Sequence, residues 1–540
     1  MRKSFMIVLA VAFVATALPA AAELQNVQVG GELRIRANYY TNAAVSPGPF
    51  RLRWPALAGV NWLQARPVGD MVSYVLSGGA PASVRGNGLG IFSPLAWDED
   101  GNDVDFIEQR TRLSVKADFT NEVSAFIELD SYDIWGDNDF RSNWITGADA
   151  RANSIDDVEV YQAYIEANEM FGLPLRSRIG RQELSLGSEW LVGVNDASSG
   201  FTGLSFDGLR LTYATDMFSV DAWAAILAEG GVAEEDEDVW FYGIYGSYLG
   251  LEDITIDAYW MWVRDARSLN DTNFAWFVEW LEDIFSVDDY DVTNIHTIGL
   301  RGAGTIGAFD FEAEAAYQWG DAGQVGYIFK PFLYGDDGAD YSDWALNLEV
   351  GYTFDMAWQP RVYLGYAYFG GEDNRDISWW EWWWPFDQPE ASVSFNRLFS
   401  NWEYSEFVDA TDLTNVHIFR GGVSATPTET LELLLAIAYM TVDEEFDSPI
   451  YFELGDFRIP IAPAMSWLTD SNDKDLGWEV GLYATYHYTE DLSFEVGWAH
   501  LFVGDGLEEG NFNQWNGLLF NGGSDNDDAD YLYFETRLAF

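Results

Sequence analysis

GELRIRANYY, at residues 31–40, alternates apolar and polar side chains along its whole length. Successive side chains of a β-strand point to opposite faces, so a strand here has one apolar face and one charged face. Residues 105–119 repeat the pattern, with apolar side chains at every second position from Leu113 to Phe119. A strand of this kind is expected where one face meets lipid and the other meets water.

Similar segments continue along the chain, joined alternately by a tight turn and a long loop rich in Asp, Asn and Gly. Tight turns are predicted near residues 120–122, 171–174, 215–216, 250–252, 304–307, 355–360, 426–428 and 489–491. These eight turns and the nine longer loops join eighteen strands. The sequence therefore predicts an all-β fold, a single transmembrane antiparallel up-and-down β-barrel with short periplasmic turns, long extracellular loops and periplasmic termini.

The strands are predicted near residues 27–41, 105–119, 123–135, 157–168, 175–186, 206–214, 218–227, 239–249, 254–264, 295–304, 308–319, 343–354, 361–370, 414–426, 430–441, 475–488, 492–503 and 529–540. The last ends in Phe540, and we expect the outer-membrane assembly machinery to recognise this closing strand. A soluble β-sandwich is the rival interpretation, because its half-buried strands also alternate. The aromatic terminus, the regular difference in loop length and the aromatic residues near strand ends favour the membrane barrel.

The N-terminal residues have the three parts of a secretion signal. Arg2 and Lys3 are basic, residues 4–18 are mostly apolar, and residues 20–22 are alanines suited to cleavage. We predict a cleavable signal peptide at residues 1–22 and a barrel at residues 23–540. No later run approaches the ~20 apolar residues of a spanning helix. The predicted location is the bacterial outer membrane, with membrane lipid and lipopolysaccharide around the barrel.

The charge of the chain restricts its partners. The formal net charge is −60, and the 540 residues include only four lysines. Nucleic acid is excluded as a partner because so acidic a surface repels phosphate. Most of the carboxylates are expected on solvated extracellular loops. The chain has no cysteine, so the fold must close by hydrogen bonding and burial rather than by disulfides.

The sequence does not predict catalysis. A nucleophile needs a base within reach, and no serine lies in a nucleophile-elbow pattern. The histidines lie on separate predicted strands, at His296, His417, His487 and His500. No glycine-rich phosphate loop or zinc-ligand spacing occurs, so we predict no enzyme activity and no cofactor. The acidic runs at 98–100 and 234–238 are interpreted as solvated loops, with weak Ca²⁺ binding as the alternative.

Two long loops have unusual sequences. Apolar residues from Phe274 to Phe285 fall at helical spacing, which predicts a short amphipathic helix that packs on neighbouring loops or narrows the pore mouth. Residues 379–384 read WWEWWW. Tryptophan at this density is expected to anchor the loop at the lipid interface, with stacking on sugar rings as the alternative.

Several arginines share the polar face of their predicted strands and are expected to line the lumen. They are Arg34, Arg36, Arg110, Arg112 and Arg210, with Arg301 and Arg361 as weaker members. Each either selects the passing solute or forms a structural ion pair with a neighbouring carboxylate, and the sequence leaves both roles open.

Residues on the same face include acidic ones, namely Glu32, Glu108, Glu128 and Asp130. The lumen wall is therefore expected to be a mixed ladder of charges, on which zwitterions, neutral sugars, cations and polyanions all remain candidate solutes.

The chain resembles the bacterial alginate-export porins, a family of eighteen-stranded outer-membrane barrels. The resemblance covers nearly the whole mature chain. Its pieces are GELRIRANYY at 31–40, EQRTRLSVKADFTNEVSAFIEL at 108–129, RIGRQELSLGSEWLVG at 178–193, FDGLRLTYATDMFSVDAWA at 206–224, GYTFDMAWQPRVYLGYAYFGGED at 351–373, FNRLF at 395–399, TNVHIFRGGVSATPTETLEL at 414–433 and LGWEVGLYATYHYTEDLSFEVGWAHLFVGDG at 476–506.

This resemblance implies a pore for a polyanionic sugar chain such as alginate, guided by arginines of the lumen wall. Guanidinium suits that task because it binds a carboxylate through two hydrogen bonds and stays charged. The bulk acidity of this sequence departs from the family's pattern. A general or cation-tolerant porin for small hydrophilic solutes therefore remains an alternative, as does a surface receptor or adhesin with acidic loops.

Arg181 enters the set of lumen arginines through the matching stretch at 178–193. Strict alternation from Ile179 would instead turn it toward lipid, where an arginine at mid-bilayer costs about 2–4 kcal/mol. We predict a β-bulge at Gly180 that turns the side chain inward.

Overall fold

The computed structural model describes residues 24–41, 104–120, 122–135, 158–194, 196, 203–228, 238–266, 292–321, 339–371, 391–408, 413–444, 447–448, 451–454, 457–460, 470–471, 473–508, 511–515, 518–521 and 528–540. Several predicted features lie outside the described residues: the signal peptide at 1–22, the helical loop at 274–285, the tryptophan-rich loop at 379–385 and the acidic run at 98–100. Of the second acidic run, only Asp238 is described.

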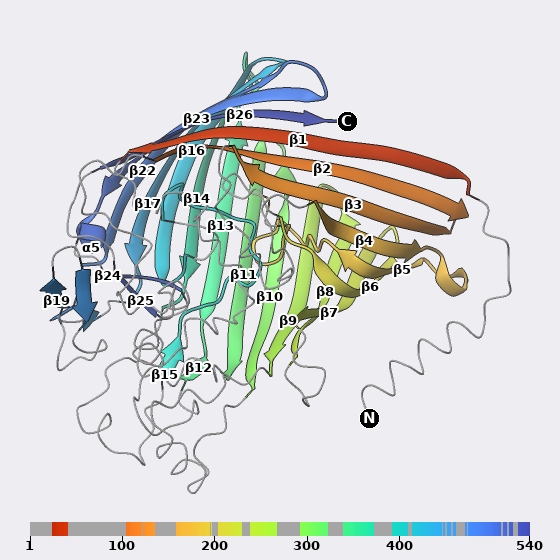
Figure 1. Ribbon diagram of the computed structural model, residues 1–540, viewed down its shortest axis with the longest axis horizontal. Helices are drawn as coiled ribbons and strands as arrows, with labels where there is room; N and C mark the ends of the chain where they lie inside the picture. The colour runs from red at the N-terminus through yellow and green to blue at the C-terminus, as the bar shows by residue number, and fades with distance from the viewer. Residues whose placement is uncertain are drawn as a thin grey trace, which may run out of the picture.

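Antiparallel strands form a closed barrel (Figure 1). The main sheet has 20 strands, of which β12 (Ala339–Tyr341) and β15 (Ala391–Val393) are short strands beside the barrel wall, which leaves eighteen in the wall. Each wall strand pairs with the next along the chain, and β26 pairs with β1. The predicted fold class and strand number are therefore confirmed.

The wall strands are β1 (Asn26–Thr41), β2 (Val104–Thr120), β3 (Val123–Ile134), β4 (Glu159–Ala167), β5 (Leu175–Gln182), β6 (Phe206–Ala214), β7 (Phe218–Ala228), β8 (Val239–Leu251), β9 (Ile254–Asp265), β10 (Thr293–Ile306), β11 (Phe309–Asp321), β13 (Trp344–Thr353), β14 (Arg361–Phe369), β16 (Val416–Thr428), β17 (Leu431–Val442), β22 (Asp475–His487), β23 (Leu492–Val503) and β26 (Ala529–Ala539).

All eight predicted tight turns join consecutive wall strands, and the longer connections lie at the other strand ends. The turn between β10 and β11 depends on glycine, because Gly307 has a φ of 66°, which other residues rarely adopt. The turn between β4 and β5 contains a 3-10 helix, η2 (Met170–Gly172). Short turns and long loops are thus segregated as in an outer-membrane barrel.

The smaller elements are paired near the loop ends of the wall strands. Two short hairpins consist of β19 (Tyr451–Leu454) with β20 (Phe457–Pro460), and β24 (Asn511–Trp515) with β25 (Leu518–Asn521). A third antiparallel pair joins β18 (Asp447–Ser448) to β21 (Asp470–Ser471), which flank β19 and β20 in the chain. The described part of the chain also has a four-residue helix, α5 (Asp505–Glu508). No helix among the described residues is both long and apolar enough to cross a bilayer.

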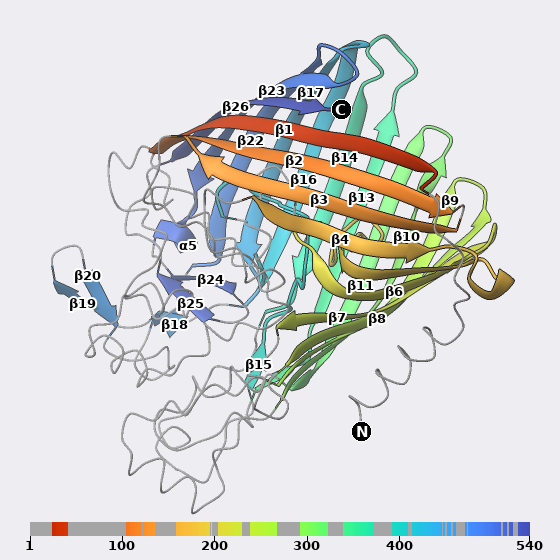
Figure 2. The same ribbon diagram turned by 45° about the vertical axis from the view of Figure 1, so that its right-hand side comes forward.

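The two faces of the wall differ in the way that the alternation predicts. Apolar side chains on the outer face are exposed, for example Leu364 (66%), Ile165 (61%) and Leu300 (59%). Polar and charged side chains of the same strands point into the barrel, where many are buried. Figure 2 shows β1 to β4 on the near side, with β13, β14, β16 and β17 behind them. The interior is thus the place where the functional polar groups gather.

A belt of aromatic side chains follows the outer face near the loop ends of the strands. Neighbouring rings stack across strands, as for Tyr242 and Trp262 (centroids 5.1 Å apart), Tyr317 and Trp344 (4.6 Å), and Tyr439 and Trp478 (4.7 Å). Amphipathic rings of this kind prefer the boundary between lipid and water. The belt corresponds to the aromatic girdle predicted from the sequence.

The first and last strands close the ring through their backbone and through Phe540. Gly31 and Phe540 exchange two backbone hydrogen bonds, of 2.8 and 3.0 Å. The Phe540 ring lies 2.6 Å from the place where a Cβ atom on Gly31 would sit. Glycine at position 31 therefore makes room for the terminal aromatic ring.

Candidate functional site

Two segments leave the wall and fold into the lumen. The first inner segment comprises residues 183–194, 196 and 203–205, between β5 and β6, and the second comprises residues 394–408 and 413–415, before β16. A parallel bridge joins Val192 to Phe399, with backbone hydrogen bonds of 2.8 Å from Phe399 to Leu191 and 2.9 Å from Gly193 to Phe399. The sequence prediction extends β5 to residue 186, whereas β5 ends at Gln182 because the chain turns inward there.

Side chains lock the two inner segments together. Trp190 Nε1 donates to the Tyr404 hydroxyl (3.0 Å), and Trp402 Nε1 donates to the Ser188 carbonyl (2.7 Å). Asn401 Nδ2 donates to Glu189 Oε2 (2.6 Å). Each of these contacts joins residues more than 200 positions apart in the chain. The inner segments therefore form one packed unit.

An apolar core fixes this unit to the wall at β6 and β8 and again at β14. Phe399 packs against Phe206 of β6 and Phe241 of β8, with ring centroids 4.9 Å apart in both pairs. Trp190 packs against Phe369 of β14, at 5.7 Å. These side chains are almost completely buried. Two polar regions border the unit, one at β1 and β2 and the other between β14 and β26.

The first polar region is the arginine group, defined as Arg34, Arg36, Arg110 and Arg112. Their exposed fractions are 6%, 1%, 1% and 8%. Alternation places them on the inner face, and the register sets Arg34 directly opposite Arg110. Like charges at directly opposite positions repel each other, so this arrangement needs carboxylates nearby.

Carboxylates of the wall surround the arginine group. Glu535 of β26 accepts hydrogen bonds from Arg34 (2.8 Å) and Arg36 (2.7 Å). Glu32 accepts from Arg110, and Asp130 accepts from Arg112 (3.1 Å). The guanidinium of Arg112 also lies over the Tyr161 ring, 4.0 Å from its centroid.

Two further carboxylates reach the arginine group from the first inner segment, and one of them, Glu183, lies 3.9 Å from Arg112. Asp196 lies within 4 Å of three of the four guanidinium groups. Burial by itself would raise the pKa of Asp196, but the charge and hydrogen bond of Arg110 and the charges of Arg112 and Arg34 outweigh it and hold that pKa below its ordinary value. Asp196 is therefore ionised at neutral pH.

The remaining predicted lumen arginines are distributed around the wall and are also paired. Arg210 donates to Asp221 (2.8 Å), Arg301 donates to Asp257 (2.7 Å) and Glu312 (3.1 Å), and Arg361 donates to Asp310 and to Glu349 (2.7 Å). The structure thus brings only Arg34, Arg36, Arg110 and Arg112 together. The inner wall is a mixed ladder of charges.

Arg181 is a correction to the sequence prediction. The β5–β6 ladder runs through Gly180 without an extra residue, pairing Gly180 with Gly208 and Arg181 with Asp207, so the predicted bulge is wrong. Unbroken alternation leaves Arg181 on the outer face with Ile179. Its charge is compensated there by Asp207 (3.0 Å) and the Val160 carbonyl (3.0 Å).

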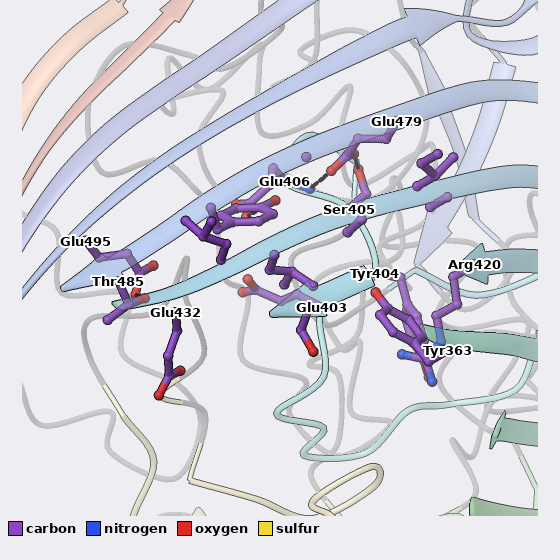
Figure 3. Close-up of a pocket in the computed structure, with 18 of the residues that line it drawn as sticks. Tyr363, Glu403, Tyr404, Ser405, Glu406, Arg420, Glu432, Glu479, Thr485 and Glu495 are labelled. Carbon is purple, nitrogen blue, oxygen red and sulfur yellow. Dashed lines mark hydrogen bonds between the residues drawn. The ribbon is translucent and has the colours of Figure 1, made fainter. Parts of the chain in front are cut away.

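The second polar region is an acidic cavity of about 650 Å³. It lies between the second inner segment and wall strands from β14 to β26 (Figure 3). The charged residues that line it are Glu403, Glu406, Glu432, Glu479, Glu495 and Arg420. Arg420, Tyr404 and Tyr363 lie at one end, and Glu432, Thr485 and Glu495 at the other (Figure 3). Five carboxylates thus face one guanidinium.

Hydrogen bonds hold these groups in place. Glu479 accepts from the Ser405 hydroxyl (2.5 Å) and the Glu406 backbone N–H (3.0 Å), and Glu406 accepts from the Tyr483 hydroxyl (3.1 Å). Arg420 lies over the Trp402 ring, 4.7 Å from its centroid. Carboxylates, hydroxyls and ring faces are groups that bind cations and sugars.

The sequence prediction did not find the acidic cavity. Glu479 and Glu495 do alternate onto the inner face of their strands, but Glu403 and Glu406 come from an irregular segment with no periodic signal. The sequence analysis predicted strands at 361–370 and 414–426, which placed residues 403–406 in an extracellular loop. The cue present in the sequence is a long connection rich in apolar and aromatic residues, which suits burial better than solvation.

The histidines do not come together. His296, His417 and His500 lie on the outer faces of β10, β16 and β23, and His487 lies at the turn end of β22. His417 is held by Asp443 (2.9 Å) and Tyr366 (2.9 Å). Among the described residues, no group of three or more His, Asp or Glu side chains is arranged to hold a metal ion.

Comparison with known proteins gives one family match. A family model described as "Alginate export" matches residues 98–517. No curated protein matches the sequence.

Among solved structures, the chain is similar to OpdQ of Pseudomonas aeruginosa, at 11% identity and a TM-score of 0.45, with 96% of this chain and 99% of that chain covered. It is also similar to OprE of Pseudomonas aeruginosa, at 11% identity and a TM-score of 0.46, with 95% and 98% covered. OmpT of Vibrio cholerae matches at 9% identity and a TM-score of 0.36, with 97% and 100% covered. The TM-scores of these superpositions are low, so the assignment of the fold as a barrel is based on the strand pairing of this chain.

Proposed function

The chain belongs to the alginate export family, and from this premise we propose that it carries an acidic polysaccharide such as alginate across the membrane through its lumen. The protein is a channel of the bacterial outer membrane. Its outer face meets lipid, and hydrophilic solute passes inside. The identity of the solute is the proposed part.

The arginine group is the observation that carries the proposal. Guanidinium stays charged and binds a carboxylate through two hydrogen bonds, which matches the repeating carboxylates of a polyuronate. Four such groups on β1 and β2 face one side of the lumen. Because these guanidinium groups are buried behind carboxylates, a passing polymer would reach them by taking the place of a carboxylate that covers them.

The carboxylates of the wall are compatible with this function. Glu535 and Glu32 already bond to the arginines, so these are not bare positive charges. Conduction requires binding that is strong enough for entry and weak enough for release. Partial neutralisation by wall carboxylates would keep a polyanion from being held too tightly.

Ion currents across planar bilayers containing the purified protein test the proposal. Anion preference in a salt gradient, and block of the current by an oligouronate but not by an uncharged oligosaccharide of equal length, are expected. Replacing Arg34, Arg36, Arg110 and Arg112 together by Gln should shift the reversal potential toward cations and abolish the block. An oligouronate that never blocks an otherwise conducting channel would count against polyuronate as the solute.

A cation-tolerant porin for small solutes is the second candidate, and the acidic cavity favours it. Five carboxylates and one arginine line that cavity. In the same bilayer measurement, strong cation preference that is lost in Glu406→Gln/Glu432→Gln would support this candidate. The charge-matched double change Glu490→Gln/Asp491→Asn, in an exposed periplasmic turn, serves as control.

Transport rather than catalysis is the proposed activity, because the described histidines stand apart on the wall.

We also propose that the β26 strand ending in Phe540 is recognised by the outer-membrane assembly machinery, and that residues 1–22 direct export. A mature N-terminus at Glu23, read by mass spectrometry of the membrane-inserted protein, would support the second of these.

A further inference from the structure

Three guanidinium groups converge on a single carboxylate that does not belong to the wall. Arg110 holds Asp196 with both of its terminal nitrogens, at 2.6 Å to Oδ1 and 3.2 Å to Oδ2. Arg34 Nη1 lies 3.3 Å from Oδ1, and Arg112 Nη1 lies 3.7 Å from Oδ2. Two-pronged contacts between guanidinium and carboxylate are among the strongest and most directional in proteins.

Asp196 differs from the other carboxylates around these arginines. Glu32, Glu535 and Asp130 lie on wall strands, where the register fixes them beside their partners. Asp196 is on the first inner segment, and its backbone N–H donates to Asn401 Oδ1 of the second inner segment (2.7 Å). Its side chain is 21% exposed, whereas those of the arginines are 8% exposed or less. The site is therefore most accessible on the side of the first inner segment, where Glu183 (28% exposed) also lies beside Arg112.

The wall carboxylates prearrange the three arginines around that position. Glu535 holds Arg34, Glu32 holds Arg110, and Asp130 holds Arg112. The Tyr161 ring beneath Arg112 further restricts its guanidinium. Glu183, which accepts from the Tyr161 hydroxyl (2.7 Å), lies 3.9 Å from Arg112. A carboxylate arriving at the position of Asp196 would find its donors already oriented.

We propose that Arg34, Arg110 and Arg112 form a binding site for one sugar carboxylate, and that Asp196 occupies this site until a uronate unit of the passing chain replaces it. The proposal rests on the proposed function, because it assumes that a polyuronate enters the lumen.

Exchange of one carboxylate for another explains how buried arginines can take part in transport. Removing the partner of a buried charge is costly, because an unpaired charge remains in a poorly solvated place. Asp196 and a uronate unit present the same carboxylate group to the same donors. The number of charge-assisted hydrogen bonds is then the same before and after the exchange, and the arginines keep a partner throughout.

The change Asp196→Asn tests the proposal, with Glu166→Gln as the matched control. Glu166 also pairs with an inner-face arginine, Arg178 (2.8 Å), but lies outside the arginine group. Both variants remove one negative charge from the lumen. The measurement is the concentration of a uronic acid oligomer that halves the ion current in planar bilayers. Circular dichroism and heat-dependent mobility in gel electrophoresis check that each variant folds.

Loss of the internal occupant should strengthen block by the oligomer. The half-blocking concentration should fall about tenfold in Asp196→Asn, because the oligomer no longer competes with a charge-assisted hydrogen-bonded partner. It should stay within about twofold of wild type in Glu166→Gln. Removing a charge away from the site changes only the long-range electrostatic potential, which salt screens. The variant Asp196→Glu, which keeps the carboxylate, should behave like wild type.

The same half-blocking concentration in wild type and Asp196→Asn would overturn the proposal. So would an equal fall in that concentration in Asp196→Asn and Glu166→Gln, because net charge alone would then explain the effect. Failure of the proposed function looks different: the oligomer would then block neither wild type nor any variant, although all of them conduct ions.

Discussion

At the scale of single residues, the Arg181–Asp207 pair places charges on the outer face of the wall, where the hydrophobic pattern favours apolar side chains. Arg181 and Asp207 are cross-strand neighbours on β5 and β6, and each compensates the other next to the exposed Ile179. An arginine facing lipid is expensive near mid-bilayer and cheaper toward the interface. Their position in the last two residues of β5 and the first two of β6, at the loop end of the barrel, is consistent with this.

The Arg181–Asp207 pair gives a prediction about stability. The change Asp207→Asn should lower the free energy of unfolding by about 1–3 kcal/mol, because Arg181 loses a charge-assisted hydrogen bond on the lipid side. The double change Arg181→Leu/Asp207→Leu should recover most of this loss. Chemical denaturation in lipid vesicles measures both. A shift of the reversal potential in Arg181→Leu would contradict the outer-face position, because a side chain outside the lumen cannot select ions.

At the scale of elements, the two inner segments decide how much of the barrel interior is open. They are joined by a parallel bridge and by contacts such as that of Trp190 with Tyr404. Their apolar core packs against β6, β8 and β14. The acidic cavity and the arginine group both border this unit, so its position determines the shape of the solute path.

Trp190 is the side chain on which this unit most depends. It is fully buried and contacts both Tyr404 and Phe369. Replacing a buried Trp by Ala typically costs about 3–5 kcal/mol. In Trp190→Ala we expect the inner segments to lose their packing while the wall stays folded. Single-channel conductance and current noise should then increase, and circular dichroism should still report an intact barrel.

The matched control for Trp190→Ala is Trp344→Ala. Trp344 is 58% exposed on the outer face, so its loss removes a ring without affecting the lumen. Conductance should then equal that of wild type. The same small conductance in Trp190→Ala as in wild type would mean that the inner segments keep their place without this side chain.

At the scale of the whole molecule, closure of the ring joins residues about 500 positions apart. β1 and β26 pair over ten residues, from Glu32 with Ala539 to Thr41 with Asp530. A strand in lipid must have every backbone group paired, so an open barrel is not a stable alternative. The hydrogen bonds that Arg34 and Arg36 donate to Glu535 on the inner face cross the same seam.

Gly31 provides a test of this seam. The change Gly31→Ala places a Cβ atom against the Phe540 ring and the Arg112 carbonyl oxygen, and should destabilise the closed barrel by about 1–3 kcal/mol, as overpacking does. Gly302→Ala is the control, because Gly302 lies in a wall strand with open space around the added atom. Folding yield into vesicles, followed by heat-dependent gel mobility, compares the two. Equal yields would show that the seam accommodates the added atom without cost.

The sequence by itself determined the wall. Strands whose side chains alternate with a period of two, separated by turn residues, can cross lipid stably only as a closed barrel. The same alternation places Arg34, Arg36, Arg110 and Arg112 on the inner face. These features are local, so a single strand such as residues 31–40 already contains them.

Only the tertiary structure decided what fills the barrel. The contact of Asp196 with three arginines and the gathering of Glu403, Glu406, Glu479 and Glu495 around one cavity join distant segments that no local period relates. Arg181 shows the same limit, because its compensation by Asp207 depends on which residue the neighbouring strand sets opposite it. Periodicity determines the face on which a side chain lies, whereas its partner is determined by how the chain packs across the lumen.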